Sequence, residues 1–120
     1  MVREFVFDMF LYFDNYRIME KIAVLSALAA LAQETRLDVF RRLVQAGPEG
    51  VSAGTVAAEL GIPAATLSFH LKELRNAQLV TREREGRSIR YAPNFSVVRS
   101  VIGYLGEHCC PVSETWSLKA

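Results

Sequence analysis

Apolar residues recur at helical spacing over the first part of the chain and predict two helices there. A first helix over residues 19–31 is apolar around much of its circumference, so it needs cover on more than one side. Its apolar positions are Ile22, Leu25, Leu28, Ala29 and Leu31. A second helix is predicted over residues 34–45, with Gly47 as its C-terminal cap. Its predicted inward residues are Leu37, Phe40, Leu43 and Val44, and its solvated ones Arg36, Arg41 and Arg42.

Two further helices follow, separated by a short turn that contains glycine. Ser52 suits the N-cap of the first, which turns Val56 and Leu60 inward and ends at Gly61. The second has Pro63 in its first turn and an apolar face formed by Leu67, Leu71 and Leu74. This order of helix, turn and helix is the pattern of a DNA-binding helix-turn-helix. The remaining face of the second helix carries small, hydroxyl, aromatic and basic side chains: Ala64, Ala65, Thr66, Ser68, Phe69 and Lys72. Such a face suits close approach to an anionic surface, although an ordinary surface helix has the same composition.

Residues 79–91 alternate charged side chains with apolar or long ones on both sides of Glu85 and Gly86. This alternation predicts a β-hairpin with glycine in its turn. A hairpin in this place is the wing of a winged helix-turn-helix, and Arg84 and Arg87 at its tip are expected to reach phosphate or the minor groove. The alternative is a solvated hairpin held by pairs of arginine and glutamate.

A last helix is predicted between Asn94, as its N-cap, and Gly106. Its apolar stripe consists of Val98, Val101, Ile102 and Leu105. Because the first helix is also more apolar than one neighbour requires, the two terminal helices are expected to pack across a two-fold axis. The predicted fold class is therefore mainly α (α+β), a winged helix-turn-helix that forms a homodimer through its N- and C-terminal helices.

Three segments follow from these patterns. Residues 19–110 form the DNA-binding and dimerisation domain, and residues 111–120 form a C-terminal tail. Residues 1–18 are an aromatic N-terminal extension that either packs on a partner subunit or is dispensable ahead of Met19. The apolar run from Ile22 to Ala32 is too short for a membrane span, so we expect no membrane partner. The two cysteines, in a chain of this kind without a secretory signal, are expected to be reduced, which predicts a cytoplasmic protein.

The charge distribution adds to this interpretation. The chain of 120 residues has a net charge of only +1. Residues 63–91 nevertheless carry six basic and three acidic side chains, and the remainder is net negative. Polarised charge of this kind suits a module that turns one side toward a polyanion.

The order of elements, with Glu-Thr-Arg-Leu-Asp-Val-Phe in the second helix and Leu-Ser-Phe-His-Leu-Lys-Glu-Leu in the fourth, resembles the ArsR/SmtB family of metalloregulatory repressors over residues 19–110. The resemblance implies a dimer that binds an inverted-repeat operator in double-stranded DNA and dissociates when an inducer binds. Carried over by position, the base-facing residues are Ala64, Ala65, Ser68 and Phe69, with Thr66, His70 and Lys72 nearby. Family members often have Gln, Ser or His where this chain has Ala64 and Phe69, so apolar contact, for example with thymine methyl groups, has to contribute here.

The inducer site is predicted at the adjacent residues Cys109 and Cys110, the two cysteines of the chain. Neighbouring Cα atoms are ~3.8 Å apart, below the usual disulfide range of ~4.4 to 6.8 Å, so free thiolates that converge on one soft ion are favoured. The chain is similar to arsenic-responsive ArsR members with a C-terminal Cys-Cys pair, but it lacks the third cysteine that follows in that subgroup. A trivalent organoarsenical, which needs two sulfurs, therefore ranks level with or above arsenite, and antimony(III) is a further inducer.

The predicted function is thus an arsenic(III)-responsive transcriptional repressor that requires no cofactor. A zinc- or redox-responsive repressor of the same fold is the alternative, with Glu107 and His108 as additional zinc ligands. A cysteine pair that binds nothing specific is also compatible with the sequence. A dithiol oxidoreductase is disfavoured because the chain has neither Cys-x-x-Cys nor a βαβ pattern. No nucleophile, base and acid constellation predicts other catalysis.

Overall fold

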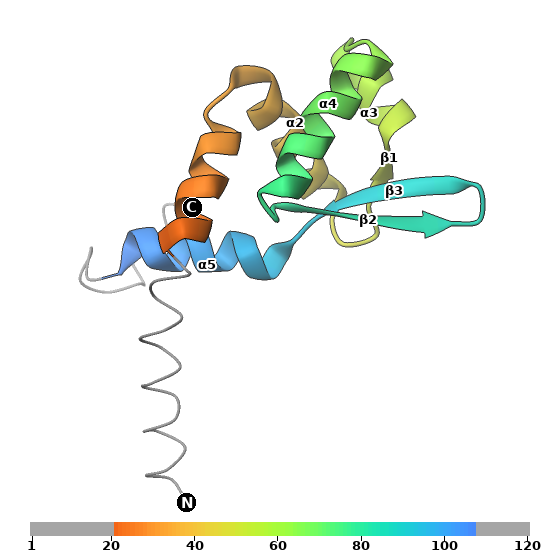
Figure 1. The fold of residues 1–120 in the computed structure, drawn as a ribbon. Helices are drawn as coiled ribbons and strands as arrows, with labels where there is room; N and C mark the ends of the chain where they lie inside the picture. Colours follow the sequence, from red (N-terminus) through yellow and green to blue (C-terminus); the bar gives the residue numbers. More distant parts are fainter. Residues whose placement is uncertain (1–20, 108–120) are drawn as a thin grey trace, which may run out of the picture.

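The computed structural model describes residues 21–107, and Figure 1 shows their arrangement. The first described element is helical over residues 21–31 and is called the N-terminal helix here. The elements that follow are α2 (Glu34–Ala46), β1 (Val51–Ser52), α3 (Ala53–Leu60), α4 (Ala64–Asn76), β2 (Val80–Glu85), β3 (Ser88–Pro93) and α5 (Phe95–Gly106). The predicted N-terminal extension, the C-terminal tail and the cysteine pair lie outside the described residues.

Side-chain hydrogen bonds fix the corner between the N-terminal helix and α2. The Gln33 side chain caps α2 by accepting a hydrogen bond of 2.7 Å from the Arg36 backbone N–H. Arg36 then reaches back, and its Nε donates a hydrogen bond of 2.7 Å to the carbonyl oxygen of Ala30. One residue of α2 therefore closes the last turn of the preceding helix.

The helix-turn-helix is formed by α3 and α4, as predicted. Ser52 caps α3, because its Oγ accepts a hydrogen bond of 3.2 Å from the Thr55 N–H. Gly61 ends the helix in the left-handed region, with φ 64° and ψ 38°, where glycine carries no Cβ penalty. Pro63 stands at the N-cap of α4, one position before the first turn that the sequence predicts. Its φ of −59° prepares the chain for the helix.

The sheet is antiparallel and has the strand order β1-β3-β2. Glu85 pairs with Ser88, so the two turn residues of the β2–β3 hairpin are Gly86 and Arg87. Gly86 has a φ of 63°, which a glycine at the first central position of a hairpin turn provides. The hairpin projects away from the helices in Figure 1 and forms the predicted wing. The two-residue strand β1 was not predicted, because it depends on pairing with the distant Tyr91 and Arg90.

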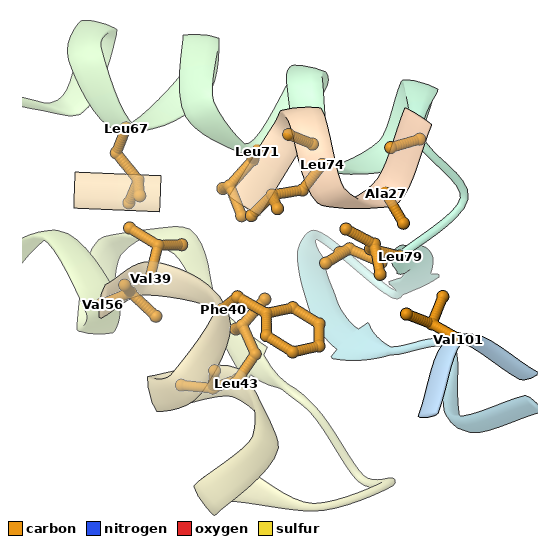
Figure 2. Packing of buried hydrophobic residues seen from close by; sticks show 14 of the residues in the cluster. Ala27, Val39, Phe40, Leu43, Val56, Leu67, Leu71, Leu74, Leu79 and Val101 are labelled. Carbon is orange, nitrogen blue, oxygen red and sulfur yellow. The ribbon is translucent and has the colours of Figure 1, made fainter. Parts of the chain in front are cut away.

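The core lies where the helices and the base of the wing meet (Figure 2). The N-terminal helix, α2 and α4 each contribute three residues to this buried cluster. The core residues labelled in the figure are Ala27, Val39, Phe40, Leu43, Val56, Leu67, Leu71, Leu74, Leu79 and Val101. The prediction for α2 is right for Phe40 and Leu43 and wrong for Leu37 and Val44, which are both 42% exposed. Val39 is fully buried in their place. The apolar stripe of α2 is thus rotated relative to the predicted one.

The terminal helices contribute to the core and also leave apolar side chains in solvent. Val24 and Ala27 of the N-terminal helix and Val101 of α5 belong to the buried cluster. The large side chains on the remaining surface of the same helices are exposed, and we call them the terminal face: Ile22, Leu25, Leu28, Ile102 and Leu105. This finding agrees with the expectation that the N-terminal helix requires cover on a second side. Within residues 21–107, none of the helices has the length and apolar character needed to cross a membrane.

Candidate nucleic-acid interface

Two opposite stripes divide the surface of α4. Leu67, His70, Leu71 and Leu74 are buried, and they follow the spacing i, i+3, i+4, i+7. Ala65, Ser68, Phe69 and Lys72 follow the same spacing two residues earlier, and all four are exposed. A shift of two residues rotates the position by about 200° around a helix with 3.6 residues per turn. The exposed stripe therefore points directly away from the core that holds the helix.

The exposed stripe contains most of the predicted base-facing residues. Ala64 and Thr66, which lie beside it in the first turn, are exposed as well. The stripe begins with a small side chain at Ala65 and ends with the ammonium group of Lys72, and the residues between them on the stripe, Ser68 and Phe69, carry no acidic group. This composition permits the helix backbone to come close to base edges in a major groove while Lys72 reaches phosphate.

Phe69 is the large apolar group of this stripe, and 55% of its surface is exposed. The edge of its ring contacts the adjacent His70, with the ring centroids 5.6 Å apart. Phe69 does not belong to the buried core cluster or to the residues packed against it. Its side chain is thus available to a partner.

The structure buries His70, which the sequence groups with the DNA-facing residues, and so separates it from the exposed stripe. Only 8% of His70 is exposed, and its Nδ1 atom lacks a hydrogen-bond partner. Burial lowers the pKa of His70 below its usual value, the charge of Arg36 lowers it further, and Glu73 partly opposes both effects. The lowered pKa favours the neutral imidazole, and the side chain faces the core rather than the exposed stripe.

The wing carries its basic side chains in exposed positions. Arg84 and Arg87, the two predicted contact residues, are both exposed, and Arg87 occupies the turn itself. Arg90 is held back on the sheet, because its guanidinium bonds the carbonyl oxygen of Gly50 at 3.0 Å and pairs with Glu85 at 3.3 Å. The arginines at the tip, together with the exposed Arg82 of β2, are thus cations that the wing can offer to a phosphate backbone.

An ion pair on the surface joins α2 to α3, the first helix of the helix-turn-helix. The Arg42 guanidinium donates two hydrogen bonds to the carboxylate of Glu59, through Nε to Oε2 and through Nη2 to Oε1 at 3.1 Å. These bonds lower the pKa of Glu59 and raise that of Arg42. The sequence did not predict this pair, because Arg42 and Glu59 are 17 residues apart and give no local signal. The helical pattern of α2 only indicated that Arg42 is a solvated side chain.

Leu79 joins α4, the wing and α5 through its peptide groups. Its N–H donates a hydrogen bond of 3.0 Å to the carbonyl oxygen of Leu74 in α4, and its carbonyl oxygen accepts one of 2.8 Å from the Asn94 N–H at the start of α5. The Leu79 side chain is fully buried. The base of the wing is thus connected directly to both the exposed helix and the C-terminal helix.

Comparison with known proteins extends this description. A helix-turn-helix domain model matches residues 31–83. The regulator CmtR of Mycobacterium bovis is 39% identical over 85 residues, which cover 67% of this chain and 69% of CmtR. An ArsR-like transcriptional regulator from Rhodococcus sp. RHA1 has a similar structure, with a TM-score of 0.65, 25% identity, and coverage of 82% of this chain and 87% of that one. The chain belongs to the ArsR/SmtB family.

Other similar proteins are described with different roles. The nodulation protein NolR of Rhizobium meliloti is 31% identical over 80 residues, which cover 67% of this chain but only 63% of NolR. AntR, described as an antimony-specific transcriptional repressor, superposes with a TM-score of 0.55 and 26% identity, over 68% of this chain and 73% of AntR. These relatives and structural neighbours are regulators rather than enzymes.

The predicted inducer ligands Cys109 and Cys110 follow Glu107, which is the C-cap of α5 and the last described residue. Among residues 21–107, no cluster of three or more His, Cys, Asp or Glu side chains is arranged to hold a metal ion. The inducer site that the sequence predicts thus lies outside the described part of this ArsR/SmtB chain and stays a prediction.

Proposed function

We propose that this ArsR/SmtB chain is a repressor that binds an inverted-repeat operator as a homodimer and releases it when a trivalent arsenical or antimonite binds Cys109 and Cys110. The observation that carries the DNA-binding part is the opposition of the two stripes on α4. Leu67, Leu71 and Leu74 anchor the helix from one side, and the opposite side is exposed and carries small, aromatic and basic side chains. Such a helix is held rigidly and can enter a major groove.

The terminal face supports the homodimer. It places five large apolar side chains of two helices in solvent, and exposed apolar surface of this kind marks an association site. A two-fold axis through this face presents two copies of α4 to half-sites about one DNA turn apart, which is ~34 Å. One solved structure of this fold, from Mycobacterium bovis, is described as a homodimeric winged helix-turn-helix DNA-binding domain.

The chemistry of the cysteine pair supports a soft inducer. Two thiolates on adjacent residues can bind one thiophilic centre, and arsenic(III) and antimony(III) prefer sulfur to oxygen ligands. A trivalent arsenical with one organic substituent has two sites left for sulfur, so Cys109 and Cys110 suffice for it. The likeness to AntR, whose description names antimony, agrees with an inducer of this class.

The decisive experiment follows operator release by fluorescence anisotropy. The complex with labelled operator is titrated with phenylarsenite, methylarsenite, arsenite, antimonite and zinc. We expect release by the trivalent arsenicals and antimonite at lower concentration than by zinc. The double variant Cys109→Ser and Cys110→Ser contains no thiol, and it should bind the operator like the parent without releasing it. Release of this variant at the parent's arsenical concentration would show that the inducer site is elsewhere.

A matched variant separates the alternative inducers. His108→Ala leaves both thiols in place but removes the nearest imidazole, which a zinc site would need as an additional ligand. Under our proposal this variant responds to phenylarsenite like the parent. Release by zinc that depends on His108, or by peroxide that depends on the thiols, together with no response to arsenicals, would establish the zinc- or redox-responsive function instead. Turnover of a disulfide substrate without any DNA binding would establish an oxidoreductase.

A further inference from the structure

We infer that Phe69 is a specificity-determining residue that recognises the C5 methyl group of a pyrimidine, thymine in unmodified DNA, in each operator half-site. The inference rests on the proposed function, because it assumes that the exposed stripe of α4 enters the major groove. Beyond the proposed function, the inference names the chemical group of the operator that the exposed stripe of α4 selects.

The position of Phe69 on α4 is the first argument. Phe69 lies between Ser68 and the buried His70 in the middle of the exposed stripe, one turn after Ala65 and three residues before Lys72. Any surface that meets Ala65 and Lys72 on this stripe also meets the phenyl ring, because residues four and three positions apart are neighbours on a helix surface. The ring cannot be avoided by a duplex that Lys72 holds through its phosphates.

The chemistry of the stripe is the second argument. The exposed stripe and the first-turn residues beside it, Ala64 and Thr66, offer two alanine methyl groups, two hydroxyl groups and one phenyl ring ahead of Lys72. The phenyl ring has no hydrogen-bond donor or acceptor, so it cannot satisfy the polar edges of guanine, cytosine or adenine, and their burial beneath it would be unfavourable. The thymine C5 methyl is the apolar group that base edges present in the major groove. Phe69 is therefore complementary to thymine and unfavourable opposite the other three bases.

The exposure of Phe69 in the free protein is the third argument. More than half of the side chain is exposed, although burial of an aromatic side chain is strongly favourable. The fold itself does not use the ring, because the core cluster and the residues packed on it do not include Phe69. A methyl contact in the groove would remove this ring from water and add to affinity only where the methyl is present.

The test removes the methyl group from DNA without changing any hydrogen bond. The full-length parent first selects a duplex from a random-sequence library, and each thymine of the selected half-sites is then replaced by deoxyuridine. For the parent, we expect one or two thymines per half-site at which this replacement weakens binding. The loss should be about four-fold for one half-site and about fifteen-fold when both half-sites are changed, as burial of one methyl-sized group per half-site predicts. For Phe69→Ala, the thymine and uracil duplexes should bind equally.

Two further arms make the result specific. At the sensitive position, a 5-methylcytosine·guanine pair should bind the parent about four-fold more tightly than a cytosine·guanine pair, and Phe69→Ala should lose this difference. Phe69→Gln should select adenine in place of thymine, because a glutamine amide pairs with adenine N6 and N7. Leu37→Ala, which truncates an exposed apolar side chain on α2, is the control and should remain as sensitive to uracil as the parent.

The outcomes distinguish this inference from the proposed function. If the parent selects no sequence from the library, the DNA-binding function fails and the inference fails with it. If the parent selects an operator but binds its uracil and thymine forms equally, or if Phe69→Ala retains the parent's sensitivity to uracil, the inference alone is overturned. The melting temperature of Phe69→Ala should match that of the parent, since the ring lies outside the core.

Discussion

The rings of Phe69 and His70 contact each other edge to face at a centroid distance of 5.6 Å, yet 55% of Phe69 is exposed and only 8% of His70. Adjacent residues of α4 thus belong to two different environments. Phe69 faces a potential partner, and His70 is part of the packing that fixes the helix. The two side chains can therefore be altered to separate effects on DNA binding from effects on stability.

The buried His70 should make the protein less stable in mild acid. Its pKa is lowered in the folded state by burial and by Arg36, whereas an unfolded histidine titrates near ~6.5. The unfolded chain therefore binds more protons between the two pKa values, and the free energy of unfolding falls as the pH decreases below about 6.5. At pH values above the pKa of His70 in the unfolded chain, both states hold the neutral imidazole, and burial of His70 costs no stability through protonation. Chemical denaturation between about pH 7.5 and 5.5 measures this loss.

A variant without the buried imidazole provides the comparison. His70→Leu should remove this pH dependence and should not lower stability near pH 7, because Nδ1 has no partner to lose. His108→Ala removes the other histidine of the chain and should keep the acid sensitivity of the parent. An equal loss of stability in acid for His70→Leu and the parent would contradict the prediction.

Gly50→Ala should destabilise the attachment of β1 to the wing. A Cβ atom at this position would lie 2.9 Å from the carbonyl oxygen of Tyr91, and the glycine has a φ of 79°. We expect a loss of at least about 2 kcal/mol in the free energy of unfolding. Gly61→Ala shares the positive φ but has open space at the Cβ position, so it should cost about 1 kcal/mol. Equal losses in the two variants would rule out the predicted contact with Tyr91.

A charge on the terminal face should break the homodimer. Leu25 and Ile102 are both 58% exposed, so Leu25→Asp and Ile102→Asp should leave the fold of the protomer intact. Sedimentation should detect monomers, and operator affinity should fall at least about ten-fold because the two half-sites are no longer linked. Val44→Asp introduces the same charge at an exposed apolar position of α2 and should preserve the dimer. A dimeric Ile102→Asp variant would place the interface elsewhere.

The arginines at the wing tip should contribute affinity without sequence preference. Arg84→Ala and Arg87→Ala should weaken specific and non-specific duplexes by similar factors, and each should reduce the slope of log K against log salt by about 0.9. Arg99→Ala, an exposed position on α5, should leave the slope unchanged. A loss confined to the selected operator would instead indicate that the wing reads bases.

The elements that could be predicted from the sequence are those with local causes. Ser52 as N-cap, Gly61 as C-cap and the glycine turn of the wing depend on residues within a few positions of one another, and the structure confirms them. Strand β1 could not be predicted, because its two residues are defined by a partner strand about forty residues later. The ion pair of Arg42 with Glu59 is likewise a product of the tertiary fold.

Periodicity contained more information on the candidate site than its residue types did. His70 lies three residues after Leu67 and four before Leu74, which places it on the buried stripe, but the chemistry of an imidazole suggests a DNA contact. The packing of α4 against the core overrides this suggestion. In α2 the spacing of Leu37 and Val44 was compatible with an inward stripe, and only the contacts of the folded chain select Val39 instead.

Leu79 lies at the junction of α4, the wing and α5, since its two backbone groups are bonded to Leu74 and Asn94 and its side chain is fully buried. A different side chain volume at this buried position would tilt the wing relative to the helix and change the spacing of the two contacts along the duplex. A repressor of this family would then differ in how its helix and wing are placed on DNA without any substitution among the exposed residues of α4 or the wing tip.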